Sequence, residues 1–328
     1  MQRANVRGVR RQRRDGAGVD RQRQGRAGGI APRLFAVRGV LPAAGAGAMM
    51  PDALPDSLLG TMVARLPVWE SRLYLGAFAL VLLWELILPM RPTPQGAWRR
   101  WGVNIGLWAV NVLLARLLPL ASALAVALWA EARGLGLFHL MTVPPPLAVL
   151  GGLLALDAAA YGVHRLMHRV PLLWRLHRTH HSDTDIDVTT GLRNHPLEVL
   201  LVPVLILPVV PVLGVPPLAL ALSALVMALM DSFTHANARL GHGLERALRR
   251  LIVTPDMHRI HHSARPTETD SNYGMFLSVW DRLFGSYVAA PANGPLGMTI
   301  GLEDFRSRRD GRFDQVLLNP LRSPARNV

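Results

Sequence analysis

The stretch that decides the fold is VLLVPVLILPVVPVLGVPPLALALSALVMALM, residues 199–230, which holds no charged side chain across 32 residues. As one helix rising about 1.5 Å per residue it would be about 48 Å long, well beyond a hydrocarbon core of about 30 Å. Prolines interrupt it on both sides of Gly214, at Pro203, Pro208, Pro211, Pro216 and Pro217. Because proline breaks helical hydrogen bonding, the stretch predicts a hairpin of two short membrane helices that turns near Gly214.

Three more apolar stretches precede the hairpin, at residues 73–90, 103–131 and 146–163. Few charges interrupt them, chiefly Glu85, Arg116 and Asp157. Half of all residues are hydrophobic, and the mean hydropathy is positive. These features predict an all-α integral membrane protein with about four transmembrane helices, including the hairpin. A soluble protein with buried helices is the weaker alternative.

Eleven of the twelve histidines lie between His164 and His262, and ten of them, all but His242, are candidate ligands. Eight of them form three clusters, HRLMH at 164–168, HRTHH at 177–181 and HRIHH at 258–262. Residues three or four apart share one face of a helix, so each cluster would project at least two imidazoles in one direction. The isolated His195 and His235 complete the ten. Such a concentration of neutral nitrogen donors indicates a site for several metal ions.

Ten imidazoles exceed the ligands that one tetrahedral or octahedral ion accepts, so at least two metals are predicted. Imidazole suits zinc, copper, iron and nickel alike. The His-Glu-x-x-His signature of zinc proteases and the Glu-x-x-His motif of ferritin-like proteins are both missing. The chain has no cysteine, which excludes thiolate haem ligation and iron–sulfur clusters. His139 and His242 stand outside the clusters and are expected to be ordinary packed or surface residues.

Arginine supplies all the basic side chains, and its distribution predicts an orientation. The segment 91–102 and the three clusters are rich in arginine, whereas the loop 132–145 has only Arg133. The positive-inside rule therefore places 91–102 and all three clusters on the cytoplasmic side, which requires the hairpin to leave and return. We expect an integral protein of a bacterial inner membrane whose histidine clusters face the cytoplasm in a helical metal domain.

The first 48 residues carry eleven arginines against two aspartates and show no apolar periodicity. Segment 1–49 is predicted to be disordered or to precede a true start at Met49 or Met50. A nucleic-acid-binding arm and a transit-like peptide are alternatives, but without a folded module we expect no nucleic-acid partner. The remaining organisation is predicted as an N-terminal segment with the first two spans (50–145), a catalytic domain (146–290) and a C-terminal tail (291–328).

The motifs HRLMH, LHRTHHSD, RNHPLE, THAN and TPDMHRIHHS occur in this order, followed by NYGMFLSVWDRLFGSY at 272–287. Over residues 73–288 this order resembles the membrane fatty acid hydroxylase and sterol desaturase superfamily. The resemblance implies a non-haem di-iron centre, with O2 as co-substrate, on the cytoplasmic face of a small helical membrane domain. It assigns the two irons to His164, His168, His177, His180, His181, His258, His261 and His262, and further to His195 and His235. Asn194 and Ser286 depart from the family pattern and are expected to bear on substrate.

Iron and O2 suit a lipid C–H bond, which offers no polarity for acid–base attack. The expected activity is hydroxylation or desaturation of a lipid from the bilayer, whether fatty acyl, sterol or another isoprenoid. No dinucleotide fingerprint or phosphate loop occurs, so electrons are expected from an external reductase with ferredoxin or cytochrome. The alternative is a histidine-rich transition-metal transporter or binding protein. It is less favoured because arginines accompany the histidines, which follow the apolar stretches rather than lie within them.

Histidine ligands usually donate their second ring nitrogen to an oxygen acceptor. The acids near enough in sequence are Asp157, Asp183, Asp185, Asp187, Glu198, Asp231 and Asp256. Asp231, one turn before His235, is the strongest candidate, with Asp157 and Asn237 behind it. Asp183, Asp185 and Asp187 are at least as well explained as solvated loop or helix-cap acids. Tyr161 and Asn237 could line the site or simply pack, and Trp174 and Trp280 are expected at the membrane surface.

Overall fold

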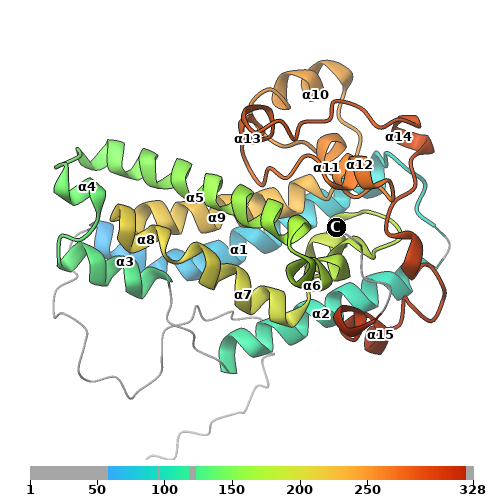
Figure 1. The fold of residues 1–328 in the computed structure, drawn as a ribbon, viewed down its shortest axis with the longest axis horizontal. Coiled ribbons are helices and arrows are strands. Elements are labelled where there is room, and N and C mark those ends of the chain that lie inside the picture. Colours follow the sequence, from blue (N-terminus) through green and yellow to red (C-terminus); the bar gives the residue numbers. More distant parts are fainter. Residues whose placement is uncertain (1–57, 95, 118–122, 323–328) are drawn as a thin grey trace, which may run out of the picture. The chain divides into compact units, whose positions relative to one another are not determined.

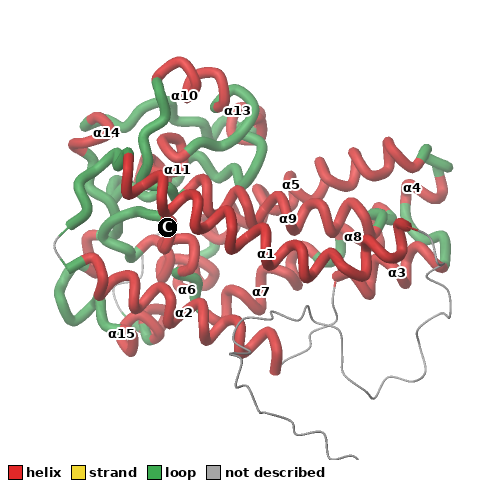
Figure 2. The backbone as a smooth tube through the Cα atoms, turned by 180° about the vertical axis from the view of Figure 1, so that it is seen from behind, coloured by secondary structure: helices red, strands yellow, loops and turns green. Residues whose placement is uncertain are grey.

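The computed structural model describes residues 58–94, 96–117 and 123–322. Within these ranges every regular element is a helix, and only three isolated β-bridges occur (Figure 2). The prediction of an all-α protein is therefore confirmed. The basic segment 1–49, with Met49 and Met50, lies outside the described residues.

One set of helices includes the hairpin and the longest helices of the structure. They are α1 (Leu58–Ile87), α2 (Ala97–Leu117), α3 (Ala123–Ala132), α4 (Leu137–Leu140), α5 (Pro145–Arg169), α7 (Pro196–Ile206), α8 (Val209–Leu213) and α9 (Pro217–Thr234). Four segments are long and apolar enough to cross a membrane: Ala123–Leu140, Pro145–Arg169, Pro196–Leu213 and Pro217–Thr234. This confirms about four spans. The expected stretch 103–131 is divided between α2 and α3, and the expected stretch 73–90 falls largely in α1.

The hairpin turns where the prolines and Gly214 predicted. Gly214 ends α8 with φ 71° and ψ 47°, a left-handed conformation that suits glycine. Pro217 occupies the first turn of α9, where proline costs no hydrogen bond. A Cβ on Gly136 would overlap the backbone of Gly214, so α4 closes tightly against the turn. Leu156 of α5 packs against residues of the hairpin in a buried apolar cluster.

Helix α9 is the centre of the helical bundle and contacts α1, α3 and α5 (Figure 1). Trp84 of α1 stacks on Phe233 of α9 with ring centroids 6.3 Å apart. Large apolar side chains remain exposed on the outer surface, such as Leu80 at 69%, with Leu150 and Val204. Apolar surface of this kind suits contact with lipid tails.

Shorter helices gather at the other end of α5 and α9, at the right of Figure 1. They are α6 (Pro171–His181), η1 (Val188–Leu192), α10 (His242–Leu248), α11 (Pro255–His261), α12 (Pro266–Thr269), α13 (Val279–Leu283), α14 (Gly294–Gly297), η2 (Glu303–Phe305), α15 (Phe313–Leu317) and η3 (Asn319–Leu321). The three histidine clusters lie in the last turns of α5, in α6 and in α11 with the residue after it. The fold thus brings all three clusters to one end of the bundle.

The acids of the loop after α6 are buried, so the expectation of solvated loop acids was wrong, whereas that of a helix-cap acid is confirmed for Asp187. Asp183 accepts from Nη1 of Arg100 at 2.8 Å and from Nδ2 of Asn104 at 3.0 Å. Burial alone would raise the pKa of Asp183, but Arg100 and Arg193 outweigh it and hold the pKa below its ordinary value. Asp187 pairs with Arg100 and forms the capping box of η1, and Asp185 is also buried. Buried polar contacts therefore hold this loop against α2.

One of the two tryptophans also departs from expectation. Trp174 is only 2% exposed, and its ring lies 4.9 Å from that of His168, so its placement at the membrane surface was wrong. It fills the space behind the histidines because α6 turns this face inward. The indole N–H of Trp280 donates to Asp157 at 2.7 Å and ties α13 to α5.

Candidate metal centre

Prolines set the positions of the helices that carry the clusters. Helix α5 ends at Arg169 and α6 begins at Pro171, so a single residue separates the helices that carry the first and second clusters. Proline starts a helix readily because its first-turn N–H would be unpaired in any case. Helix α11 likewise begins at Pro255, behind Thr254, whose hydroxyl accepts from the backbone N–H of Met257.

Nine of the ten predicted histidines converge into two adjoining groups. The five-histidine group consists of His164, His168, His177, His181 and His261, and the four-histidine group of His180, His235, His258 and His262. Within each group the possible ligand atoms lie within 4.8 Å of one another, and every member is buried. The groups touch where the rings of His181 and His262 stack at 4.6 Å. Adjoining groups of this size could hold two ions side by side.

The Nε2 atoms of the four-histidine group face one another. Nε2 of His235 lies 3.2 Å from that of His180 and 3.0 Å from that of His258, which is 3.2 Å from that of His262. In the other group, Nε2 of His164 lies 3.1 Å from that of His177. Nitrogens bound at right angles to one ion by bonds of about 2.1 Å would lie about 3 Å apart. The spacing therefore fits shared coordination.

Hydrogen bonds at the opposite nitrogens fix the tautomers in the five-histidine group. Nδ1 of His164 donates to the carbonyl of Tyr273 at 2.8 Å, and Nδ1 of His261 donates to that of Ser271 at 2.7 Å. Nδ1 of His177 donates to Oε1 of Glu198 at 2.7 Å. A carbonyl can only accept, so Nδ1 carries the proton and Nε2 keeps its lone pair. Lone pairs that face each other repel unless a cation lies between them, and these residues therefore fit a metal.

The electrostatics favour the neutral imidazoles that a metal requires. Burial first, and neighbouring histidines second, hold the pKa values of His180, His181, His258 and His262 well below the ordinary value. The same causes lower the pKa of His261 to about 3. Burial also lowers the pKa of His235, but its bonds to Asp231 outweigh this and raise the pKa overall.

His195 is the one predicted ligand that the structure does not bring to either group. Its Nε2 donates to the carbonyl of Leu317 at 3.1 Å, and its Nδ1 accepts from the backbone N–H of Leu197 at 3.2 Å. Both ring nitrogens therefore serve structure, one in capping α7 and one in holding the C-terminal segment. His139 lies on α4 at the far end of the hairpin, and His242 is exposed at the start of α10.

Of the acids predicted to lie beside the histidines, Asp231 does so and Asp157 does not. The structure places Asp231 next to His235, with Oδ1 3.3 Å and the backbone carbonyl 2.8 Å from Nδ1. A Cβ on Gly191 would come within 2.5 Å of Oδ2 of Asp231, so glycine makes room for this carboxylate. Asp157 instead accepts from the backbone N–H of Leu277 and from Trp280, which binds the closing segment to α5.

Other candidates bond away from the histidines. Asn237 exchanges hydrogen bonds with the backbone of Arg91, and its own N–H donates to Glu85. Tyr161 shares a hydrogen bond of 2.8 Å with Ser286, which also donates to Asp281. Ser286 thus stabilises the closing segment. Asp256 pairs with Arg259.

Two histidine partners were not singled out from the sequence. Glu198, in the first turn of α7, was only one of several nearby acids, although it follows His195 by three residues in RNHPLE. Asp270, whose Oδ1 lies 3.3 Å from Nδ1 of His168, was missed altogether. It is 102 residues from that histidine, and the motif PTETDSN carries no signal of the contact.

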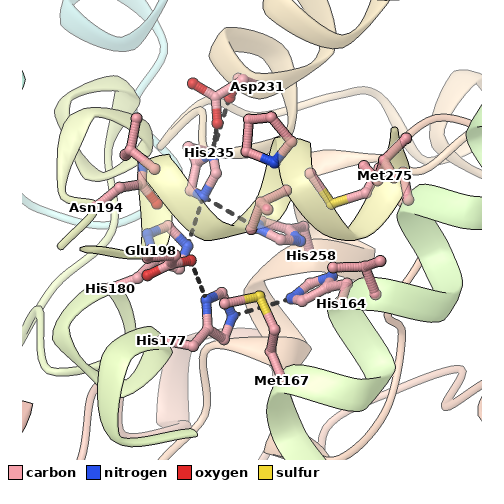
Figure 3. A pocket seen from close by; sticks show the side chains of 16 residues that line it. His164, Met167, His177, His180, Asn194, Glu198, Asp231, His235, His258 and Met275 are labelled. Carbon is pink, nitrogen blue, oxygen red and sulfur yellow. Dashed lines mark hydrogen bonds and ion pairs between the residues drawn. The ribbon is translucent and has the colours of Figure 1, made fainter. Parts of the chain in front are cut away.

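A cavity of about 320 Å³ adjoins both groups (Figure 3). Five histidines line it, namely His164, His177, His180, His235 and His258. Apolar side chains from α5 and α7 form much of the rest, including Val163, Val199, Val202 and Ile206. Asn194, Glu198 and Asp231 add polar atoms. The arrangement lets an apolar ligand reach the histidine groups from among the helices of the bundle.

Comparison with known proteins agrees with this geometry. The fatty acid hydroxylase family model matches residues 149–286, from α5 to Ser286, and spans all ten predicted histidines. Ornithine lipid hydroxylase OlsE of Rhizobium tropici is 31% identical over 244 residues, which cover 72% of this chain and 71% of that protein. The chain belongs to the fatty acid hydroxylase superfamily.

Other relatives match over a shorter part of the chain. The alkylglycerol monooxygenases of Xenopus tropicalis and Homo sapiens are 31% and 30% identical over 152 residues, or 46% of this chain. The matched region spans 33% of the length of each of these two proteins. No solved structure matches significantly. The superfamily membership confirms the resemblance inferred from the order of the histidine motifs.

Proposed function

We propose that this chain is a membrane-bound, O2-dependent, non-haem di-iron enzyme that hydroxylates a C–H bond of a lipid. The observation that carries the proposal is the pair of histidine groups, with Nε2 atoms facing one another beside a largely apolar cavity. The relatives support hydroxylation over desaturation, because those compared are named as a lipid hydroxylase and as monooxygenases.

Each histidine group would hold one iron ion. The five-histidine group offers more ligands than the four-histidine group, which suits two inequivalent sites. When bound, the iron pair would supply the activation of O2 that an unpolarised C–H bond requires. His195 is not included as a ligand in this proposal, because both its ring nitrogens already have partners.

The chain's own residues prepare the site in three ways. Glu198 and the carbonyls of Tyr273 and Ser271 orient imidazoles by accepting from Nδ1. The apolar wall of α5 and α7 would align the alkyl chain of a lipid, and burial would exclude bulk water. Burial also keeps most of the imidazoles neutral and ready to bind metal.

Electrons would come from outside the chain, through a reductase with ferredoxin or cytochrome. We further propose that the histidine end of the bundle faces the cytoplasm, as the arginines of 91–102 suggest. Single cysteines at exposed positions of this cysteine-free chain test the orientation. Cysteine at Arg99 and at Gly243 should label only from the cytoplasm, and cysteine at Met141 only from the opposite side. Labelling of Arg99 and Gly243 from different sides would contradict the arrangement.

The function is tested by metal analysis and by lipid mass spectrometry. We expect two iron ions per purified chain and, in membranes that contain the enzyme, a lipid whose mass rises by one oxygen atom. Labelled O2 should supply that oxygen. Stoichiometric zinc or nickel with no oxygen incorporation into any lipid would overturn the proposal and favour the metal transporter or binding protein instead.

A further inference from the structure

The polar side chains of the cavity, apart from its histidines, carry acceptors and no cation. Asn194, Glu198 and Asp231 line it, and no arginine is among its described lining residues although the chain has many. Figure 3 shows Asn194 and Glu198 on one side and Met275 on the other. The cavity wall is therefore mixed, with an apolar surface and a set of oxygen acceptors next to the two histidine groups.

Glu198 offers one oxygen that the protein does not use. Its Oε1 accepts from His177, whereas Oε2 is buried and finds no hydrogen-bond partner within the described part of the chain. The side chain is only 6% exposed. A buried carboxylate oxygen without a donor is costly, so a donor from a ligand would be favoured at this position.

Asn194 and Asp231 extend the same acceptor set. The Nδ2 of Asn194 donates to the carbonyl of Gly191 at 2.8 Å, and its side chain lines the cavity, where Oδ1 can accept a hydrogen bond. The side chain of Asp231 is 29% exposed and lines the cavity beside His235. Gly191 lies against both residues. Its carbonyl accepts from Asn194, and a larger side chain at this position would collide with the Asp231 carboxylate.

We propose that these three residues form a subsite for a hydrogen-bond donor, a hydroxyl or ammonium group, in the polar part of the lipid substrate. The subsite would disfavour an ionised carboxylate or phosphate at this point, because neither offers a proton to these oxygen acceptors. This inference rests on the proposed function and narrows its substrate class.

The position of the subsite also fixes where the substrate is oxidised. Glu198 bonds directly to His177, and Asp231 bonds directly to His235, so the donor group lies next to both histidine groups. The carbon that reacts is therefore within a few bonds of the polar group. The alkyl chain follows the apolar wall of Val199, Val202 and Ile206, away from the metals.

The test compares three lipids with the same alkyl chain, using the full-length, iron-loaded protein with a reductase. The lipids are hexadecylglycerol with hydroxyls, hexadecylamine with an ammonium group, and palmitate with a carboxylate. We expect oxygen insertion near the polar end of the first two and at least tenfold lower kcat/KM for palmitate. Palmitate oxidised as well as the others, or oxidation at the far end of the chain, would overturn the subsite.

Variants of Asn194 sharpen the test, because no described hydrogen bond joins its side chain to a histidine. Asn194→Leu should raise KM for hexadecylglycerol about tenfold with kcat and iron content nearly unchanged. Asn194→Asp should shift preference toward hexadecylamine by a similar factor. Asn293→Leu, at an exposed helix cap far along the chain, is the matched control and should change neither. Equal effects of the Asn194 variants on all three lipids would contradict the proposal.

Binding to the metal-free protein separates this inference from the proposed function. Hexadecylglycerol should bind without iron, and Asn194→Leu should weaken that binding about tenfold. If no lipid is ever oxidised but this binding pattern appears, the proposed function fails and the subsite stands. If lipids are oxidised regardless of head group, the function stands and the subsite fails.

Discussion

The two histidine groups differ in how their outer nitrogens are held. In the five-histidine group, Nδ1 of four rings faces an oxygen of Tyr273, Asp270, Glu198 or Ser271. In the four-histidine group only His235 has such a partner, Asp231. Among the described residues, Nδ1 of His180, His258 and His262 has no hydrogen-bond partner.

From this difference we infer that the two groups have different roles. Acceptors at Nδ1 fix the orientation of a ligand ring and increase its basicity, so the five-histidine group resembles a tightly held site. The four-histidine group supplies three of the five histidines that line the cavity. Its ion would be held less firmly and would lie nearer to the substrate.

The largest effect is expected from the removal of one ligand in either group. His181→Ala and His258→Ala should each abolish hydroxylation, by at least about a thousandfold, because both ions are needed. Iron measured by emission spectrometry should fall below two per chain while the protein still inserts into membranes. His242→Ala, at an exposed position, is the control. A variant of either kind that keeps two irons would contradict the assignment of its group.

Chelation should remove the two ions at different rates. The ion of the four-histidine group should leave first, by a factor of about ten to one hundred, since each outer acceptor contributes on this scale to affinity. Stepwise iron loss, followed by Mössbauer spectroscopy, would show one site emptied before the other. Loss of both ions in a single phase would mean that the outer hydrogen bonds do not distinguish the groups.

A smaller effect is expected at Gly191, where an added Cβ would meet Asp231, the partner of His235 in the four-histidine group. Gly191→Ala should push the Asp231 carboxylate away from His235, because the new Cβ would lie 2.5 Å from Oδ2. Activity should fall severalfold and the first phase of iron loss should accelerate, with the second phase unchanged. Gly243→Ala, at an open position, is the matched control. Equal acceleration of both phases would show that the change is not local.

The smallest effect is expected at His195. His195→Asn keeps a side chain that can cap α7, so stability should fall by no more than about 1 kcal/mol and iron should stay at two per chain. His235→Asn, in contrast, should lose iron. The pair of variants separates a histidine that caps a helix from one that binds metal. Iron loss in His195→Asn would restore it to the ligand set.

Much of the fold was predictable because it depends on local patterns. The uncharged, proline-broken stretch 199–230 predicted the hairpin, and Gly214 marked its turn. Histidines at helical spacing predicted which residues meet at the site. His195 could not be separated from the others, since one ring nitrogen caps α7 at Leu197 and the other reaches Leu317, 122 residues away.

The partners of the site were less predictable for a related reason. Asp231 was found because it lies one turn from His235 on the same helix. Asp270 meets His168 only through the fold, and Asp157 faces Trp280 rather than a histidine for the same reason. Tryptophan is common at membrane surfaces, but the packing of α6 buries Trp174. Contacts between distant segments carry little signal in a single sequence.

The shortness of the hairpin arms has a consequence for the surrounding bilayer. Pro196–Leu213 and Pro217–Thr234 have 18 residues each, or about 27 Å, whereas Pro145–Arg169 has 25 residues, or about 37 Å. Only the first 19 residues of α5, about 28 Å, are apolar, because its last turns from His164 carry histidines and arginines. All three apolar lengths therefore fall slightly short of a core of about 30 Å, and the bilayer beside the bundle would thin to match them. Head groups would then sink toward the cavity on the side of α7, and the protein would partition into thin, fluid membranes in preference to thick ones.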